Sequence, residues 1–114
     1  MALADVTKIP GREGPEPDGR GFRTVRLIDM PASYTTGGES LTTAQLGFSK
    51  APDWVEIDPK GGYVFEYDKT NQKVKAYRAD YDAVADGALI EVAAAVNLSA
   101  VVDVVVRAYG THAA

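Results

Sequence analysis

Short runs in which apolar and polar residues alternate constrain the fold of this chain more than any other feature. From Phe22 onward, these runs are separated by Pro, Gly and Asp. The clearest run is Tyr63–Tyr67, where three aromatic side chains occupy every second position and so share one face of a strand. A polar turn leads from it into a second alternating run, Gln72–Arg78. The pattern predicts a hairpin over residues 63–78 within an antiparallel β-sandwich or small barrel.

Other apolar runs predict further strands. The Val-rich run 101–109 favours a central strand, because β-branched side chains fit a sheet better than a helix. Ala88–Val92 is ambiguous, since the apolar residues between Leu89 and Val96 also fit a helical stripe, and we favour the strand. Two more strands are predicted at Phe22–Ile28 and Trp54–Ile57.

Two connecting segments have recognisable turn chemistry. Asp58–Gly62 places Asp, Pro and Gly where a type I turn prefers them, so it is expected to join two strands. One short helical turn is expected at 43–47, because a threonine can cap its amides and Gly47 can end it in the left-handed region.

The first twenty residues differ in composition from the rest. They hold almost no large apolar side chain, and such a segment cannot build a core of its own. We therefore expect an extended N-terminal arm at 1–20 that lies outside the core and is ordered by another chain, followed by one domain at 21–114. The residues that suggest the arm are Pro10, Gly11, Gly14, Pro15, Pro17 and Gly19.

The composition indicates a globular chain and excludes several classes. Its 114 residues are the usual size of one domain. Without cysteine, it has neither a disulfide framework nor the thiolates of a typical structural zinc site. The start lacks the features of a signal peptide, and no apolar run is long enough for a membrane helix. We expect a soluble protein, made inside the cell, that does not act at a membrane.

The charge distribution argues against nucleic acid as a partner. The net charge is −4, whereas nucleic-acid binding needs cations that neutralise phosphates along one face. A local basic cluster fits a solvated hairpin surface. It consists of Lys69, Lys73, Lys75 and Arg78.

The sequence contains no constellation that predicts an enzyme. Its only histidine, His112, lies near the C-terminus, where a base is poorly held. The carboxylates lie in turns or alternate with buried positions, as on a solvated surface. The glycine pairs lack the spacing of a phosphate-binding loop. A calcium site in the acidic stretch 80–87 is an alternative, although that stretch lacks the spacing of a calcium loop. We expect no catalytic residue, no cofactor and no metal.

Four segments together resemble small virion structural proteins of tailed bacteriophages. They are Tyr34–Glu39, Leu41–Gly47, Tyr63–Asp68 and Lys73–Tyr77. The resemblance implies a capsid decoration, or cement, protein that binds the outer surface of a phage head and stabilises it. It also implies the major capsid protein as partner, a homo-oligomer that is commonly a trimer, and a place on the virion after synthesis in the host cytoplasm. The long arm departs from the family pattern.

Two sets of residues are candidates for contacts in such an assembly. Because a domain of this size gains stability by assembling, we expect an apolar interface between copies. Polar contacts with the shell are expected from the arm. The candidate subunit-interface residues are Tyr63, Phe65, Tyr67, Val102, Val104 and Val106, and the candidate capsid contacts are Arg12, Glu13, Glu16 and Arg20.

Two other functions stay open. A carbohydrate-binding β-module on a virion or cell surface would use Trp54 and the tyrosines as an aromatic platform, although aromatics at every second position more often face a core or subunit interface. A tail or head-completion structural protein would assemble into rings or hexamers instead of trimers.

Overall fold

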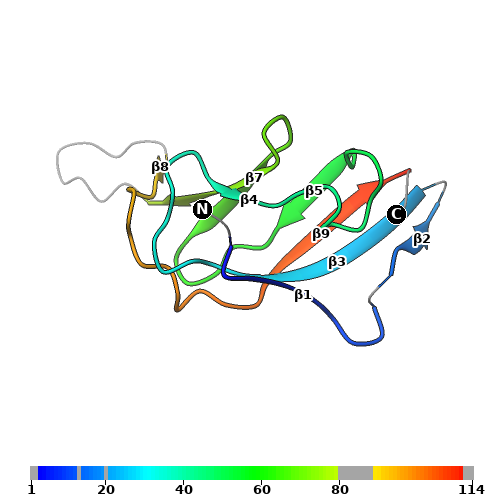
Figure 1. The fold of residues 1–114 in the computed structure, drawn as a ribbon, viewed down its shortest axis with the longest axis horizontal. Coiled ribbons are helices and arrows are strands. Elements are labelled where there is room, and N and C mark those ends of the chain that lie inside the picture. The colour runs from blue at the N-terminus through cyan, green and yellow to red at the C-terminus, as the bar shows by residue number, and fades with distance from the viewer. Residues whose placement is uncertain (1–2, 13, 20, 80–88, 112–114) are drawn as a thin grey trace.

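The computed structural model describes residues 3–12, 14–19, 21–79 and 89–111, and these residues form strands and turns without a helix. This confirms the mainly β class. Figure 1 shows the strands in chain order. They are β1 (Asp5–Lys8), β2 (Glu16–Asp18), β3 (Gly21–Asp29), β4 (Glu39–Ser40), β5 (Trp54–Ile57), β6 (Val64–Asp68), β7 (Lys73–Arg78), β8 (Ile90–Glu91) and β9 (Val104–Gly110).

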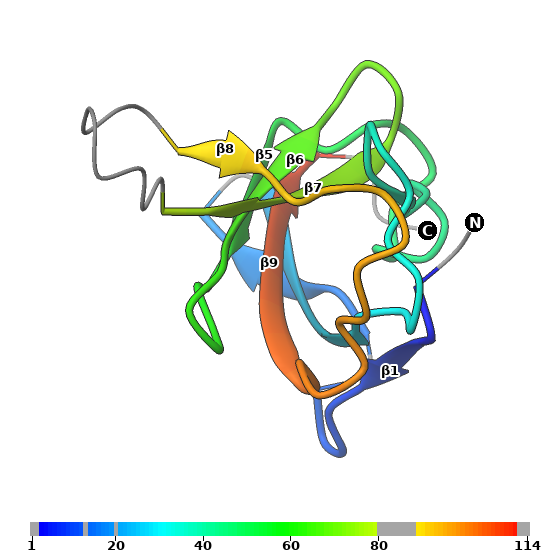
Figure 2. The same cartoon turned by 90° about the vertical axis from the view of Figure 1, so that its left-hand side faces the viewer.

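The strands form two antiparallel sheets. In the five-stranded sheet, here called the large sheet, the order is β1-β3-β9-β5, and β2 also pairs with β3. In the four-stranded sheet, here called the small sheet, the order is β4-β7-β6, and β8 also pairs with β7. β3 and β9 run side by side through the large sheet in Figure 1. Figure 2 shows β6, β7 and β8 as a layer over β9 and β1.

Alternating burial along the strands places the core between the two sheets. In β9 every second residue is buried, beginning at Val104 and including Val106. Phe65 of β6 faces the same core from the small sheet and is 6% exposed. Phe65, Val104 and Val106 were candidates for the subunit interface, and this prediction is wrong. Their side chains are already covered by the chain's own second sheet, so they are not accessible to another copy.

The N-terminal segment belongs to the fold, which corrects the expected arm. β1 pairs with β3 from Asp5 opposite Asp29 to Lys8 opposite Arg26, and β2 pairs with the other end of β3. Leu3 is 8% exposed within the core. A few apolar residues are enough because β3 supplies the partner strand. Whether the segment also contacts another chain stays a prediction.

The predicted hairpin at 63–78 is confirmed as β6 and β7. The carboxylate of Asp68 accepts hydrogen bonds from the backbone N–H groups of Thr70 (3.1 Å) and Asn71 (3.2 Å) and fixes the turn. The predicted strands at 22–28 and 54–57 are confirmed as β3 and β5, and 101–109 is confirmed from Val104 onward. The ambiguous run 88–92 contributes the short strand β8.

The segment 42–47 contains hydrogen-bonded turns where a helical turn was expected. The backbone N–H of Leu46 donates to the carbonyl oxygen of Thr42 at 3.1 Å. The hydroxyl of Thr42 accepts from the N–H of Gln45, whose side-chain oxygen accepts from the N–H of Thr42. Gly47 follows at φ +86°. Hydrogen bonds hold this turn against the middle of β3, because the Thr24 hydroxyl donates to the carbonyl of Leu46 at 2.6 Å and Arg26 donates to the carbonyl of Gln45.

Candidate functional site: the outer face of the large sheet

One row of side chains crosses four strands on the side of the large sheet that faces away from the core. Residues directly opposite one another in a sheet point to the same face. Arg23 of β3 is opposite Glu16 of β2 on one side and Tyr109 of β9 on the other. Tyr109 is in turn opposite Trp54 of β5. We call this set of four residues the outer row.

Trp54 makes the outer row unusual for a solvated sheet surface. Its side chain is 61% exposed, although tryptophan has more apolar surface than any other residue and is normally highly buried. Trp54, Glu56 and Tyr109 line an open hollow of about 350 Å³. The two aromatic rings therefore border a concave surface that a ligand or a protein side chain can enter.

Beside the outer row, one arginine is paired with two carboxylates. Arg107 donates to both carboxylate oxygens of Asp58, at 2.9 and 3.1 Å, and lies 3.8 Å from Glu56. Hydrogen bonding to Asp58 raises the pKa of Arg107. Exposed ion pairs of this kind contribute little to stability, and this cluster of one arginine and two carboxylates has a formal charge of −1.

Glu16 is the carboxylate at the other end of the outer row. Arg12 donates to it at 2.7 Å, and Arg23 lies 3.6 Å away. Hydrogen bonding to Arg12 holds the pKa of the Glu16 carboxyl below its ordinary value. Arg12 and Glu16 were candidate capsid contacts, and the structure brings them together at this face. Glu13 and Arg20, the other two candidates, lie outside the described residues.

The remaining candidate interface residues are scattered. Val102 is 40% exposed and precedes β9, whereas Tyr63 and Tyr67 are half-buried against the core. The Tyr67 hydroxyl donates to the carbonyl of Leu41 at 2.8 Å, and burial raises its pKa to about 12. Tyr63, Phe65 and Tyr67 therefore pack inward, although Tyr67 and Trp54 both line a hollow of about 250 Å³ beside β5.

Sequence reasoning missed Arg23, Arg107 and Tyr109 as partners of Trp54. Arg107 and Tyr109 alternate with buried residues of β9, whereas Arg23 precedes three consecutive buried residues of β3. The register that places Arg23 opposite Tyr109 is what puts Arg23 on the outer face. The pairing between strands so far apart in the chain was the missing information.

A second polar cluster has a structural role. The Tyr34 hydroxyl donates to the carboxylate of Glu91 at 2.7 Å and accepts from the N–H of Ala76 at 3.0 Å, and burial raises its pKa. The fully buried Glu39 accepts from the N–H of Thr35 at 2.7 Å. Within the described part of the chain, its second oxygen has no hydrogen-bond partner. The cluster fixes the loop at 34–39 against the small sheet.

No group of three or more His, Asp or Glu side chains is arranged to hold a metal among the described residues. His112 and the acidic stretch from Asp80 to Gly87, where a calcium site was the alternative, lie outside them. In the part of the chain that the structure describes, no helix is long and apolar enough to cross a membrane.

Comparisons with protein-family models, curated proteins and solved structures give no match to this chain.

Proposed function

We propose that this protein is a non-enzymatic capsid decoration protein that docks on the outer surface of a phage head through the outer row and the ion pairs beside it. The resemblance of four segments to virion proteins suggests the class. The observation that supports the docking face is Trp54, 61% exposed and directly opposite Tyr109.

The composition of this face suits a protein partner. Trp, Tyr and Arg are the residues that most often dominate binding energy at protein interfaces. Here they lie on one surface, formed by β2, β3, β9 and β5. Because Arg107 and Arg23 already have carboxylates nearby, docking does not leave isolated charges without a counter-charge. A rigid sheet also loses little entropy when it binds.

Self-association remains part of the proposal, with a trimer as the expected state. Several copies that each make a modest contact with the shell bind more strongly together than one copy alone. The interface between copies must use exposed residues, and Val102 is the candidate that still meets this condition. Light scattering on the purified protein measures the mass, and rings or hexamers would favour the tail or head-completion alternative.

A carbohydrate-binding module is the second candidate. The hollow between Trp54 and Tyr109, with the Glu56 carboxylate on its wall, has the aromatic surface and hydrogen-bond acceptor that a sugar ring requires. The outer row, however, extends over four strands, which is broader than one sugar needs. We therefore rank the protein partner first.

Cosedimentation with phage heads that lack the protein tests the proposal. We expect the wild-type chain to bind, and Trp54→Ala to weaken binding about tenfold or more, as expected for an interface hot spot. Val64→Ala is the matched control, because Val64 is also exposed (42%) but lies on the small sheet. Heads without the protein should assemble and rupture at lower temperature. Binding to glycans but not to heads would instead identify the sugar-binding module.

A further inference from the structure

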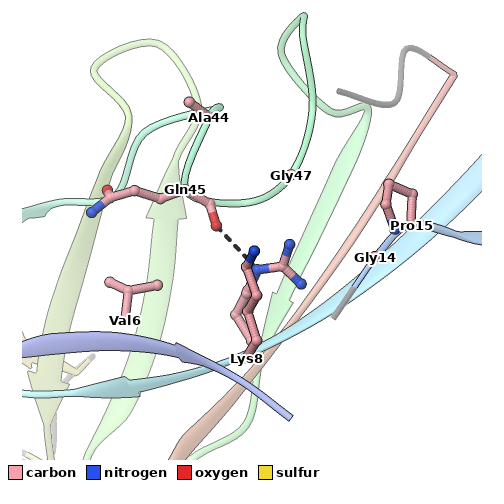
Figure 3. Close-up of a pocket in the computed structure, with 8 residues that line it drawn as sticks. Val6, Lys8, Gly14, Pro15, Ala44, Gln45 and Gly47 are labelled. Carbon is pink, nitrogen blue, oxygen red and sulfur yellow. Dashed lines mark hydrogen bonds between the residues drawn. The ribbon is translucent and has the colours of Figure 1, made fainter. Parts of the chain in front are cut away.

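A cavity of about 390 Å³ lies at the opposite side of β3 from the outer row. Its lining comes from three parts of the chain, namely Val6 and Lys8 of β1, Arg26 of β3, and Gln45 and Gly47 of the 42–47 turn. Figure 3 shows these parts around the cavity, with Gly14 and Pro15 at its edge.

Arg26 is a buried cation without a counter-charge in the described part of the chain. Its side chain is on the inner side of β3 and only 3% of the residue is exposed. Nε donates to the carbonyl of Gln45 at 3.2 Å, the dashed line of Figure 3, and Nη1 donates to the carbonyl of Val25 at 2.9 Å. Both acceptors are neutral. Burial lowers the pKa of Arg26, but a guanidinium remains charged at neutral pH.

Lys8 adds a second positive charge to the same cavity. It is directly opposite Arg26 in the β1–β3 ladder, and it also lines the cavity. Like charges at directly opposite positions destabilise a sheet. Among the residues whose side chains the structure describes, Lys8 has no ion-pair partner. Two uncompensated cations therefore meet here in a chain whose net charge is −4.

Gly47 packs directly against the end of the Arg26 side chain. A Cβ atom at this position would lie 2.7 Å from Nη2 of Arg26, so any other residue would push against the guanidinium. Nε and one N–H of Nη1 donate to carbonyls, and the other N–H groups of the guanidinium are donors that a ligand can use. Arginine and lysine donors at one site are a common way to bind phosphate and carboxylate groups.

We propose that this cavity binds a small oxyanion, a phosphate or a carboxylate group, between the guanidinium of Arg26 and the ammonium of Lys8. The volume falls within the range of small-molecule sites, about 300–1,000 Å³. Val6 and Pro15 supply apolar contacts for a small organic group that carries the anion. The site lies on the other side of the large sheet from the docking face and does not depend on the proposed function.

An NMR titration with inorganic phosphate tests this site, with chloride at equal ionic strength as reference and acetate as a second probe. We expect saturable shifts of the amide signals of Gln45 and Gly47. Saturable binding of either probe supports the site, and the stronger of the two identifies the anion class. Lys8→Gln should weaken the affinity about tenfold, because it removes one charged donor. Lys69→Gln, at the exposed β6–β7 turn, is the matched control and should bind as the wild type does.

Three results would overturn the proposal. The first is no saturable shift with either probe. The second is equal affinity in the wild type and in Lys8→Gln. The third is saturable binding of phosphate or acetate that is seen only in the variant Glu13→Gln. The Glu13 carboxylate would then be the natural occupant of the cavity.

Discussion

Arg23 and Arg26 belong to the same strand and face opposite sides of the large sheet, and their surroundings differ in charge compensation. Arg23 lies 3.6 Å from the carboxylate of Glu16 on the outer face. Arg26 is more deeply buried but donates only to neutral carbonyls, and Lys8 is opposite to it. A buried charge costs more to desolvate than an exposed one, yet it is the buried Arg26 that has no counter-charge among the described residues.

This difference assigns different chemistry to the two sides. A surface whose arginines are already paired can be covered by another protein at little electrostatic cost. A cavity lined by two cations that have no carboxylate partner in the described part of the chain attracts an anion instead. The strand β3 therefore contributes to a protein-docking face on its outer side and to a small-ligand site on its inner side. Each of the following substitutions or deletions changes one of these two sides, or both.

Deleting residues 2–20 should have the largest effect, because it removes β1 and β2 and exposes one edge of β3. It also removes Leu3 from the core, and burying a leucine alone contributes roughly 2–5 kcal/mol. We expect a truncated chain that is unfolded or melts at a much lower temperature by circular dichroism. If the truncated chain is as stable as the full one, residues 2–20 do not contribute to the core and form an arm, as the sequence predicted.

Gly47→Ala should disturb the cavity and leave the outer face intact. Its φ of +86° is costly for alanine, and the new methyl group would meet Nη2 of Arg26. Gly62→Ala is the matched control, because φ is +87° but no atom lies within 4 Å. The strained backbone conformation should lower the free energy of unfolding by about 1 kcal/mol in both variants. The contact with Arg26 should lower it further in Gly47→Ala only. Equal decreases in the free energy of unfolding, measured by chemical denaturation, would show that the added methyl group at position 47 does not clash with Arg26.

Lys8→Glu should give the cavity the same charge pairing as the outer face, with a carboxylate opposite an arginine. It places a carboxylate opposite Arg26, so repulsion is replaced by attraction, and we expect a gain in stability of up to about 1 kcal/mol that decreases with added salt. It should also abolish phosphate binding. Lys69→Glu makes the same charge change at the β6–β7 turn and should leave stability nearly unchanged. A loss of stability in Lys8→Glu would mean that the two cations are not in repulsion.

The smallest expected effect is the pH dependence of the outer face. The pKa of Glu16 is lower in the folded chain than in the unfolded chain because Arg12 donates to it. Its contribution to stability is therefore present above the ordinary glutamate pKa of about 4.3 and is lost as the pH falls through the folded value. In an NMR titration, Arg12→Gln should return the Glu16 pKa toward the ordinary value. An unchanged pKa would exclude the contact with Arg12 in solution.

Local sequence patterns predicted the strands well because alternation and turn chemistry are local properties. The hairpin of β6 and β7, the strand β3 and most of β9 were predicted in this way. The first segment was mispredicted because Leu3 and Val6 are too few to form a core by themselves, and only the pairing with β3 brings them against one. Composition describes what a segment can bury alone, but not what a neighbouring strand adds.

The candidate site was less predictable because it depends on pairing between distant strands. Arg12 and Glu16 were chosen for their charge, and Trp54 for its aromatic ring, but their common face arises from the register of four strands. Phe65, Val104 and Val106 show the converse error. An apolar residue at every second position faces either a core or a partner, and only the second sheet decides between them.

Hydroxyl-radical footprinting of the protein on phage heads tests the central claim most directly, since it reports which side chains the shell covers. The comparison is between free and head-bound protein, with Trp54 and Tyr109 as reporters for the outer row, and Val64 and Leu89, 42% and 48% exposed, as reporters for other surfaces. We expect Trp54 and Tyr109 to be strongly protected from oxidation when the protein is bound to heads, and the oxidation of Val64 and Leu89 to change little. Unchanged oxidation of Trp54 together with protection of Val64 or Leu89 would place the docking surface elsewhere and contradict the account.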